Sequence, residues 1–203
     1  DFSIKARNHR QQHPGKIEEK KISETTIAIP EEDLEQGHLC AFLPTQHETN
    51  LPFHINADFF PTSDRKRIIF ESDYQSDWNR LAIEASAESF KSNINEIRSI
   101  FGHKRFWKIL DDIKKVFDDS ESGRCEKSLG SFWNLLNPVL RDMEIVFSSQ
   151  NEWILPSKAV LLLQKDEVNA LPILEDFGIA VAHEDLRPYQ TLLRSSSIGI
   201  KPL

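Results

Sequence analysis

Short runs of alternating apolar and polar residues, the pattern of β-strands, mark the first third of the chain. The clearest run is residues 53–60, in which positions 53, 55, 57 and 59 are apolar and positions 54, 56 and 58 are polar. Successive side chains of a strand point to opposite faces, so this run predicts a strand with one buried face. Residues 25–29 and 39–43 predict two more strands, and the acidic turn between them favours an antiparallel pair. Residues 2–6 predict a short strand at the start.

After residue 76 the apolar residues recur at intervals of three and four, as they do in helices. The first such stripe predicts a helix that is capped by Ser76 or Asp77 and ended by Gly102. The second predicts a helix over residues 106–117. In that helix Trp107 lies about 100° around the axis from Phe106, so Trp107 is expected to be the less buried of the two.

Residues 129–143 predict a third helix, which Pro138 should kink or split. The final segment is mixed: residues 145–155 predict a hairpin, residues 157–163 a short helix, and residues 171–177 a helix closed by glycine. A strand over residues 179–181 and a helix begun by Asp185 complete the prediction. The expected fold is α+β, with an N-terminal antiparallel sheet, central helices and a small C-terminal α/β element. Two domains are expected, at residues 1–122 and 123–203.

Charge and composition narrow the function classes. The formal net charge is −7 and the pI is near 5.5, which gives no general attraction to nucleic acid or anionic lipid. Cys40 and Cys125 stand alone, without the spacing of a metal site or a disulfide framework. No apolar stretch is long enough to cross a bilayer. We expect a cytoplasmic protein, and we interpret Asp1 as a cut inside a longer chain.

The chemistry-bearing motifs of common enzymes are missing from the sequence. The seven glycines are scattered singly, so no phosphate-binding loop is formed, and the seven histidines do not pair at helical metal spacing. We therefore expect no cofactor and no metal in this chain. The isolated chain should bind ATP no more tightly than about 100 μM, roughly −5.5 kcal/mol.

One polar group of residues stands out. His54, Asn56 and Asp58 project from the polar face of the predicted strand over residues 53–60, which leads into a basic loop containing Arg65, Lys66 and Arg67. One interpretation is a surface strand followed by a solvated turn. The other is an anion-binding loop at a strand end, where a planar guanidinium engages a phosphate through two hydrogen bonds.

An ordered series of short motifs resembles a known family. Residues 42–44 read FLP, residues 50–60 read NLPFHINADFF, and residues 63–67 read SDRKR; DWN follows at residues 77–79 and WILPSKA at residues 153–159. This series is similar to the sacsin-like branch of the ATPases of the ninety-kilodalton heat-shock chaperone (GHKL) type. One departure is Asn50, where the family often has Gly. Asn tolerates positive φ, so the turn can be kept.

The resemblance implies that an ATP-binding domain with its bound Mg lies before Asp1. In such ATPases the following domain supplies a Lys or Arg that reaches the γ-phosphate. Arg65 matches that position best, with Arg67 second and Lys66 third, and Arg65 should be exposed and free of a carboxylate partner. The implied function is the middle segment of a chaperone-like ATPase, which senses nucleotide and couples it to conformational change. Its expected partners are the upstream ATP-binding domain, a client protein and a second copy of the chain.

Besides the function implied by the resemblance, two alternatives remain open. The first is a protein-interaction module with no nucleotide role, and the second is the coupling segment of a defence or nucleic-acid-processing ATPase. The first alternative needs no function for Arg65. The isolated chain is not expected to be an enzyme by itself; the resemblance implies ATPase activity only for the longer protein.

Overall fold

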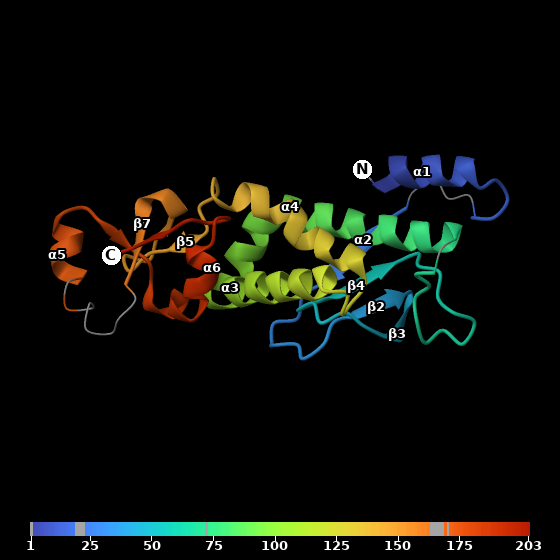
Figure 1. The fold of residues 1–203 in the computed structure, drawn as a ribbon, viewed down its shortest axis with the longest axis horizontal. Coiled ribbons are helices and arrows are strands. Elements are labelled where there is room, and N and C mark those ends of the chain that lie inside the picture. Colours follow the sequence, from blue (N-terminus) through green and yellow to red (C-terminus); the bar gives the residue numbers. More distant parts are fainter. Residues whose placement is uncertain (1, 19–22, 72, 163–168, 170) are drawn as a thin grey trace. The chain divides into compact units, whose positions relative to one another are not determined.

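The computed structural model describes residues 2–18, 23–71, 73–162, 169 and 171–203, and it confirms an α+β fold (Figure 1). The chain forms two compact units. Unit 1 comprises Asp1–Asn93 and Asp112–Trp133, and unit 2 comprises Ile94–Asp111 and Asn134–Leu203. The units are not contiguous in sequence, whereas the prediction placed a single boundary after residue 122, inside unit 1. None of the described helices combines the length and the apolar composition that a membrane span requires.

The described residues of unit 1 contain a four-stranded mixed sheet with strand order β1-β4-β2-β3. Its strands are β1 (Thr25–Ala28), β2 (His38–Ala41), β3 (Leu43–Glu48) and β4 (His54–Ala57). β1 and β3 run antiparallel to their neighbours, but β2 and β4 are parallel. The predicted antiparallel pair of β1 and β2 is therefore wrong, and the sheet is not purely antiparallel. β4 lies between β1 and β2 instead, and its residue Ile55 is fully buried.

The alternation predicted for β4 is confirmed. Ile55 and Ala57 are buried, whereas His54 and Asn56 are half-buried. The strand predicted over residues 39–43 ends earlier, because Phe42 has a φ of 62° and turns the chain into β3. Asn50 has a φ of 56°, as the turn before β4 was expected to require.

One helix of unit 1 lies against this sheet, and a second helix packs on the first. α1 (Phe2–Gln12) replaces the short strand predicted at residues 2–6. Phe2, Ala6 and His9 are buried at helical spacing, and Phe2 packs on Trp78 with ring centroids 5.8 Å apart. The prediction failed because five residues are too few to separate a period of two from a period of 3.6.

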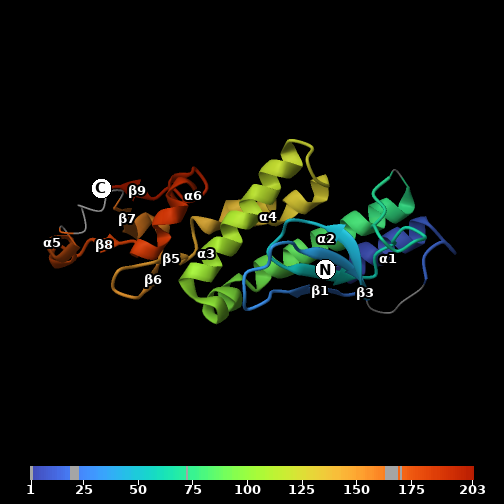
Figure 2. The same ribbon diagram turned by 90° about the horizontal axis from the view of Figure 1, so that it is seen from below.

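α2 (Tyr74–Ser92) contacts α1, β1 and β4 (Figures 1 and 2). Its N-cap is Asp73, whose carboxylate accepts hydrogen bonds from the amides of Gln75 and Ser76, so the helix begins before the predicted caps. α3 (Ile94–Glu121) follows at once. Within it Gly102 leaves helical geometry with a φ of 68°, at the position where the sequence predicted a helix end.

The core of unit 1 is aromatic. The rings of Phe53, Phe90 and Phe132 form a triangle with centroid distances of 5.3, 5.1 and 5.9 Å. Phe132 belongs to α4 (Ser131–Leu140), which follows the short η1 (Lys127–Gly130). Pro138 lies within α4 and does not split it into two helices. The helix ends at Leu140, two residues after Pro138.

Unit 2 contains two small sheets in the described residues. The elements are the antiparallel pair β5 (Val146–Phe147) and β6 (Trp153–Ile154), the turn η2 (Pro156–Lys158), and the parallel strands β7 (Ala159–Leu161), β8 (Ala180–Val181) and β9 (Lys201–Pro202). The predicted hairpin is confirmed as β5 and β6. The helix predicted from Ser157 is wrong as far as residue 162, because Ala159 and Leu161 are buried on one face of a strand; residue 163 lies outside the described residues.

The described residues of unit 2 also include α5 (Leu171–Asp176), η4 (Glu184–Tyr189) and α6 (Gln190–Arg194), and α5 contacts β8. Parts of α3 and α4 belong to this unit as well. Trp107 and Phe106 of α3 are both fully buried, so the predicted difference between them is wrong. The indole Nε1 of Trp107 donates to the carbonyl of Ile145 at 2.9 Å, and its ring stacks on Tyr189. This segment of α3 is therefore covered on two sides.

Candidate functional site

The basic loop after β4 is closed by hydrogen bonds of its own backbone. The amide of Thr62 donates to the carbonyl of Arg67, and the amide of Arg65 donates to the carbonyl of Thr62, both at 2.8 Å. The carboxylate of Asp64 accepts from the hydroxyl of Thr62 at 2.6 Å and from the amide of Lys66 at 3.0 Å. These two bonds hold the pKa of Asp64 below its usual range. The carboxylate of Asp64 therefore stabilises the loop through hydrogen bonds to other residues of the same loop.

Asn79 of α2 fixes both ends of this loop. Its side chain is fully buried: Oδ1 accepts from the amide of Phe60 at 2.7 Å, and Nδ2 donates to the carbonyls of Phe60 and Ile69 at 2.9 and 2.8 Å. The neighbouring Trp78 donates from Nε1 to the carbonyl of Asp58 at 2.7 Å. The DWN motif of the sequence therefore ties the start of α2 to the stem of the basic loop.

Arg65 is exposed at the tip of this loop, with a φ of 58°. Its Nη2 donates to the carbonyl of Ala41 at 3.1 Å. Among the described residues no carboxylate pairs with this guanidinium, and Lys66 and Arg67 are exposed beside it. One edge of the guanidinium is thus held by the protein, and the side chain carries a positive charge into solvent.

The polar face of β4 is used by the sheet itself. Nδ1 of His54 accepts from the amide of His38 at 3.1 Å, and Oδ1 of Asn56 accepts from the amide of Phe42 at 3.0 Å. His54 and Asn56 therefore hold β2 and its end against β4. Asp58 lies beyond the strand and is half-buried. The structure does not gather these three side chains into one site with Arg65.

Arg65 and Asn56 nevertheless meet the same short segment. Arg65 donates to the carbonyl of Ala41, which directly precedes Phe42, and Asn56 accepts from the amide of Phe42. A positive φ is unusual for a bulky residue, so these two bonds stabilise a strained turn. The turn presents Phe42 at 72% exposure and Leu43 at 64%. Unit 1 thus displays an arginine and two apolar side chains on neighbouring loops.

Two histidines of this sheet accept hydrogen bonds and must be neutral to do so. Nδ1 of His47 accepts from the amide of Ile68 at 3.1 Å, and Nδ1 of His54 accepts from His38. Burial lowers the pKa of His47 below its ordinary value. Burial, together with the neighbouring His38, also lowers the pKa of His54.

Acid should therefore weaken unit 1 in a defined range. Below about pH 6.5 the unfolded chain binds more protons than the folded chain at His47 and His54, so the free energy of unfolding falls as the pH drops through their folded-state values. His47→Gln keeps an acceptor for Ile68 but does not titrate. We expect urea unfolding at pH 7.5 and pH 5 to show a smaller loss for this variant, by about 1 kcal/mol. If the free energy of unfolding falls equally between pH 7.5 and pH 5 in the wild type and in the variant, His47 does not contribute to the acid sensitivity.

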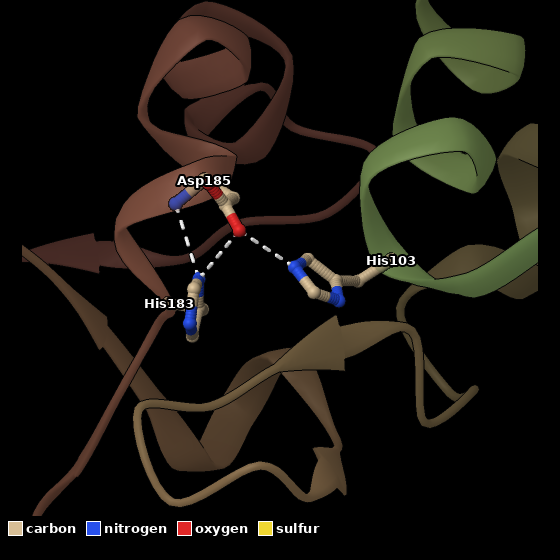
Figure 3. A group of neighbouring side chains, drawn as sticks. All are labelled: His103, His183 and Asp185. Carbon is tan, nitrogen blue, oxygen red and sulfur yellow. Dashed lines mark hydrogen bonds and ion pairs between the residues drawn. The ribbon is translucent and has the colours of Figure 1, made fainter.

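Unit 2 holds a second cluster that spacing did not reveal, formed by His103, His183 and Asp185 (Figure 3). Oδ2 of Asp185 lies 2.8 Å from Nε2 of His103 and 3.2 Å from Nδ1 of His183. Lys104 approaches the other carboxylate oxygen at 3.1 Å. The hydrogen bond from His103 holds the pKa of Asp185 below its usual range. His103 and Asp185 are 82 positions apart, so only the fold brings them together.

A cavity of about 240 Å³ adjoins this cluster in unit 2. Its lining includes His183 and Glu184, together with apolar residues of β7 and β8 such as Leu161 and Val181. Small-ligand sites likewise combine apolar walls with a few polar groups, but most are larger than this cavity. His183 therefore belongs both to the cluster and to the wall of a cavity.

Comparisons with known protein families, with curated proteins and with solved structures find no match for this chain. Function must therefore be argued from the two groups of residues just described.

Proposed function

We propose that this chain is the middle segment of a cytoplasmic, chaperone-like ATPase of the sacsin-like type. In this proposal an ATP-binding domain before Asp1 holds ATP and Mg, and Arg65 reaches the γ-phosphate when the two parts close. Arg67 and Lys66 are the second and third candidates for that role. The segment senses nucleotide, and it couples nucleotide to a change of conformation that acts on a client protein or on a second copy of the chain.

The observation that carries this proposal is the way Arg65 is held. One guanidinium nitrogen is fixed on Ala41, the loop is closed by its own hydrogen bonds, and Asn79 anchors both loop ends. Ordering an arginine side chain on binding carries an entropic cost, and a side chain that is already positioned avoids much of it. A planar guanidinium is also suited to phosphate oxygens.

Local charge supports an anionic ligand rather than a cationic one. Arg65, Lys66 and Arg67 are exposed in succession, whereas the only acid among them, Asp64, accepts hydrogen bonds from Thr62 and Lys66. The loop thus has an excess positive charge although the whole chain is acidic. Such a focused charge favours a phosphate group brought by another domain.

The exposed pair Phe42 and Leu43 supports a second candidate, a protein-interaction module without a nucleotide role. Large apolar side chains exposed side by side are typical of contacts with other proteins. In that case Arg65 serves only to hold the turn at Ala41. The two candidates differ in whether Arg65 responds to the γ-phosphate.

Protection of Arg65 from chemical modification distinguishes these candidates. In the protein that includes its ATP-binding domain, an arginine-specific dicarbonyl reagent should modify Arg65 about tenfold more slowly when a non-hydrolysable ATP analogue is bound, and ADP should protect much less, because only ATP carries the γ-phosphate. Mass spectrometry of the loop peptide reads both Arg65 and Arg67. Equal modification rates with the analogue, with ADP and without nucleotide would favour the interaction module.

A further inference from the structure

We propose that His103, His183 and Asp185 bind one divalent transition-metal ion of the Zn²⁺ type. Two imidazoles and one carboxylate are a donor set that such ions prefer. His103 lies in α3, whereas His183 is the N-cap of η4 and Asp185 lies in its first turn, so a bound ion would join α3 to the start of η4 (Figure 3). This site is independent of Arg65 and of the proposed nucleotide response.

The distances between the donor atoms are close to those of a metal site. With bonds of about 2.0–2.1 Å, tetrahedral ligands lie about 3.3 Å apart. The separation of 3.2 Å is close to this value, the separation of 2.8 Å has to widen by about 0.5 Å, and all three ligand atoms lie within 4.8 Å of one another. The third separation needs to close by about 1.5 Å at most. Rotation of half-buried side chains supplies such a movement without a change of fold.

Phe147 holds both histidine ligands in place. Its ring stacks on the ring of His103 at 4.2 Å with an interplanar angle of 6°, and its carbonyl accepts from the amide of His183 at 2.7 Å. His103 also follows Gly102, whose positive φ of 68° ends the preceding helical segment and sets the direction of the next one. A metal site gains affinity when its ligands are positioned before the ion arrives.

Two other groups act on the carboxylate and on His183. Lys104 binds Oδ1 of Asp185, which leaves Oδ2 to face the histidines. The amide of Asp185 donates to Nδ1 of His183 at 3.2 Å, and a metal on that nitrogen replaces this bond. The ion also replaces the hydrogen bond between Nε2 of His103 and Oδ2 of Asp185, so the cost is two hydrogen bonds, against which three metal bonds are formed. Lys104 orients the carboxylate, but its positive charge opposes a cation.

Three protein ligands leave at least one coordination position for water. Sites of this kind are catalytic in zinc proteins more often than structural, because structural sites use four protein ligands. The cavity of about 240 Å³ that His183 borders gives room for a small molecule beside the ion. The site therefore fits an ion that activates water or binds a small anionic or carbonyl group.

Metal titration of the chain tests this proposal. Isothermal calorimetry with Zn²⁺, and visible absorption with Co²⁺ as a spectroscopic substitute, should show one ion per chain. His103→Ala, His183→Ala and Asp185→Asn should each weaken binding at least about tenfold, as expected for loss of one ligand. At a Zn²⁺ concentration of 100 times Kd the melting temperature should rise on the order of 5 °C. The variants should lose this rise.

His38→Asn is the matched control, because His38 and His54 form another close imidazole pair, with ring centroids 5.5 Å apart. Binding should be unchanged in this variant. Lys104→Gln should bind the ion about threefold to fivefold more tightly, since it keeps a hydrogen-bond donor and removes a charge near the surface. The proposal is overturned if His38→Asn loses the ion, or if Asp185→Asn with an unchanged circular dichroism spectrum binds it as the wild type does.

Discussion

In the full-length ATPase that we propose, replacing Arg65 with Ala is expected to slow ATP turnover about 10³-fold, while the free energy of unfolding changes little. Arginines that reach a transferring phosphoryl group from a neighbouring domain stabilise charge that develops in the transition state, and their loss costs 10³-fold or more. Arg65 is exposed, and its described contact is a single hydrogen bond to Ala41. Loss of that bond should cost about 0.5–1 kcal/mol of stability.

Neighbouring substitutions separate a specific contact from a general effect of charge. Lys66→Ala removes an exposed cation from the same loop and should reduce turnover by less than about tenfold. Arg65→Lys keeps the charge but not the planar pair of donors, so it should recover only part of the rate. Steady-state turnover and urea unfolding of all three variants give the comparison. If Arg65→Ala unfolds the protein and leaves turnover per folded molecule unchanged, Arg65 only holds the turn at Ala41.

The sequence predicted those elements whose pattern is long or whose turn residues are specific. The apolar stripe of α3 and the alternation of β4 each cover enough residues to distinguish their periods, and both are confirmed. Gly102 and Gly178 both have positive φ where helix ends were expected. Local signals of this kind need no knowledge of distant residues.

The pattern was insufficient where the apolar run is short. Residues 2–6 and residues 159–161 are short runs, and each was assigned to the wrong type: the first is part of α1, and the second is β7. The local pattern of apolar residues also did not predict which strands pair with one another in the sheet. β4 pairs with both β1 and β2, although the turn between β1 and β2 suggested that those two strands meet.

In the candidate sites, too, the sequence predicted local features but not the contacts between distant residues. Exposure of Arg65 followed from its place in a polar loop after a strand, but its bond to Ala41 depends on how β2 ends at Phe42. The cluster of His103 and Asp185 joins positions 82 apart and has no local signature. Sequence spacing finds metal ligands only when they share one element or one turn.

Gly37→Ala is expected to destabilise unit 1 by about 4 kcal/mol or more, enough to leave much of the protein unfolded or insoluble. A Cβ at this position would lie 2.2 Å from the carbonyl oxygen of Phe53 and 2.5 Å from that of Leu51. Both are backbone atoms, so no side-chain rotation relieves the clash. The side chains of Phe53 and Leu51 are fully buried, and the loop cannot retreat without withdrawing them from the core.

Gly123→Ala is the matched control for this substitution. Gly123 has a φ of 74°, which disfavours Ala, but a Cβ there meets nothing within 4 Å. It should therefore cost only about 1 kcal/mol, from backbone strain alone. Urea unfolding of the two variants separates collision from strain. Because the segment around Gly37, Leu51 and Phe53 precedes β2 and β4, a stability within 1 kcal/mol of wild type for Gly37→Ala would mean that these strands are not packed as closely as described.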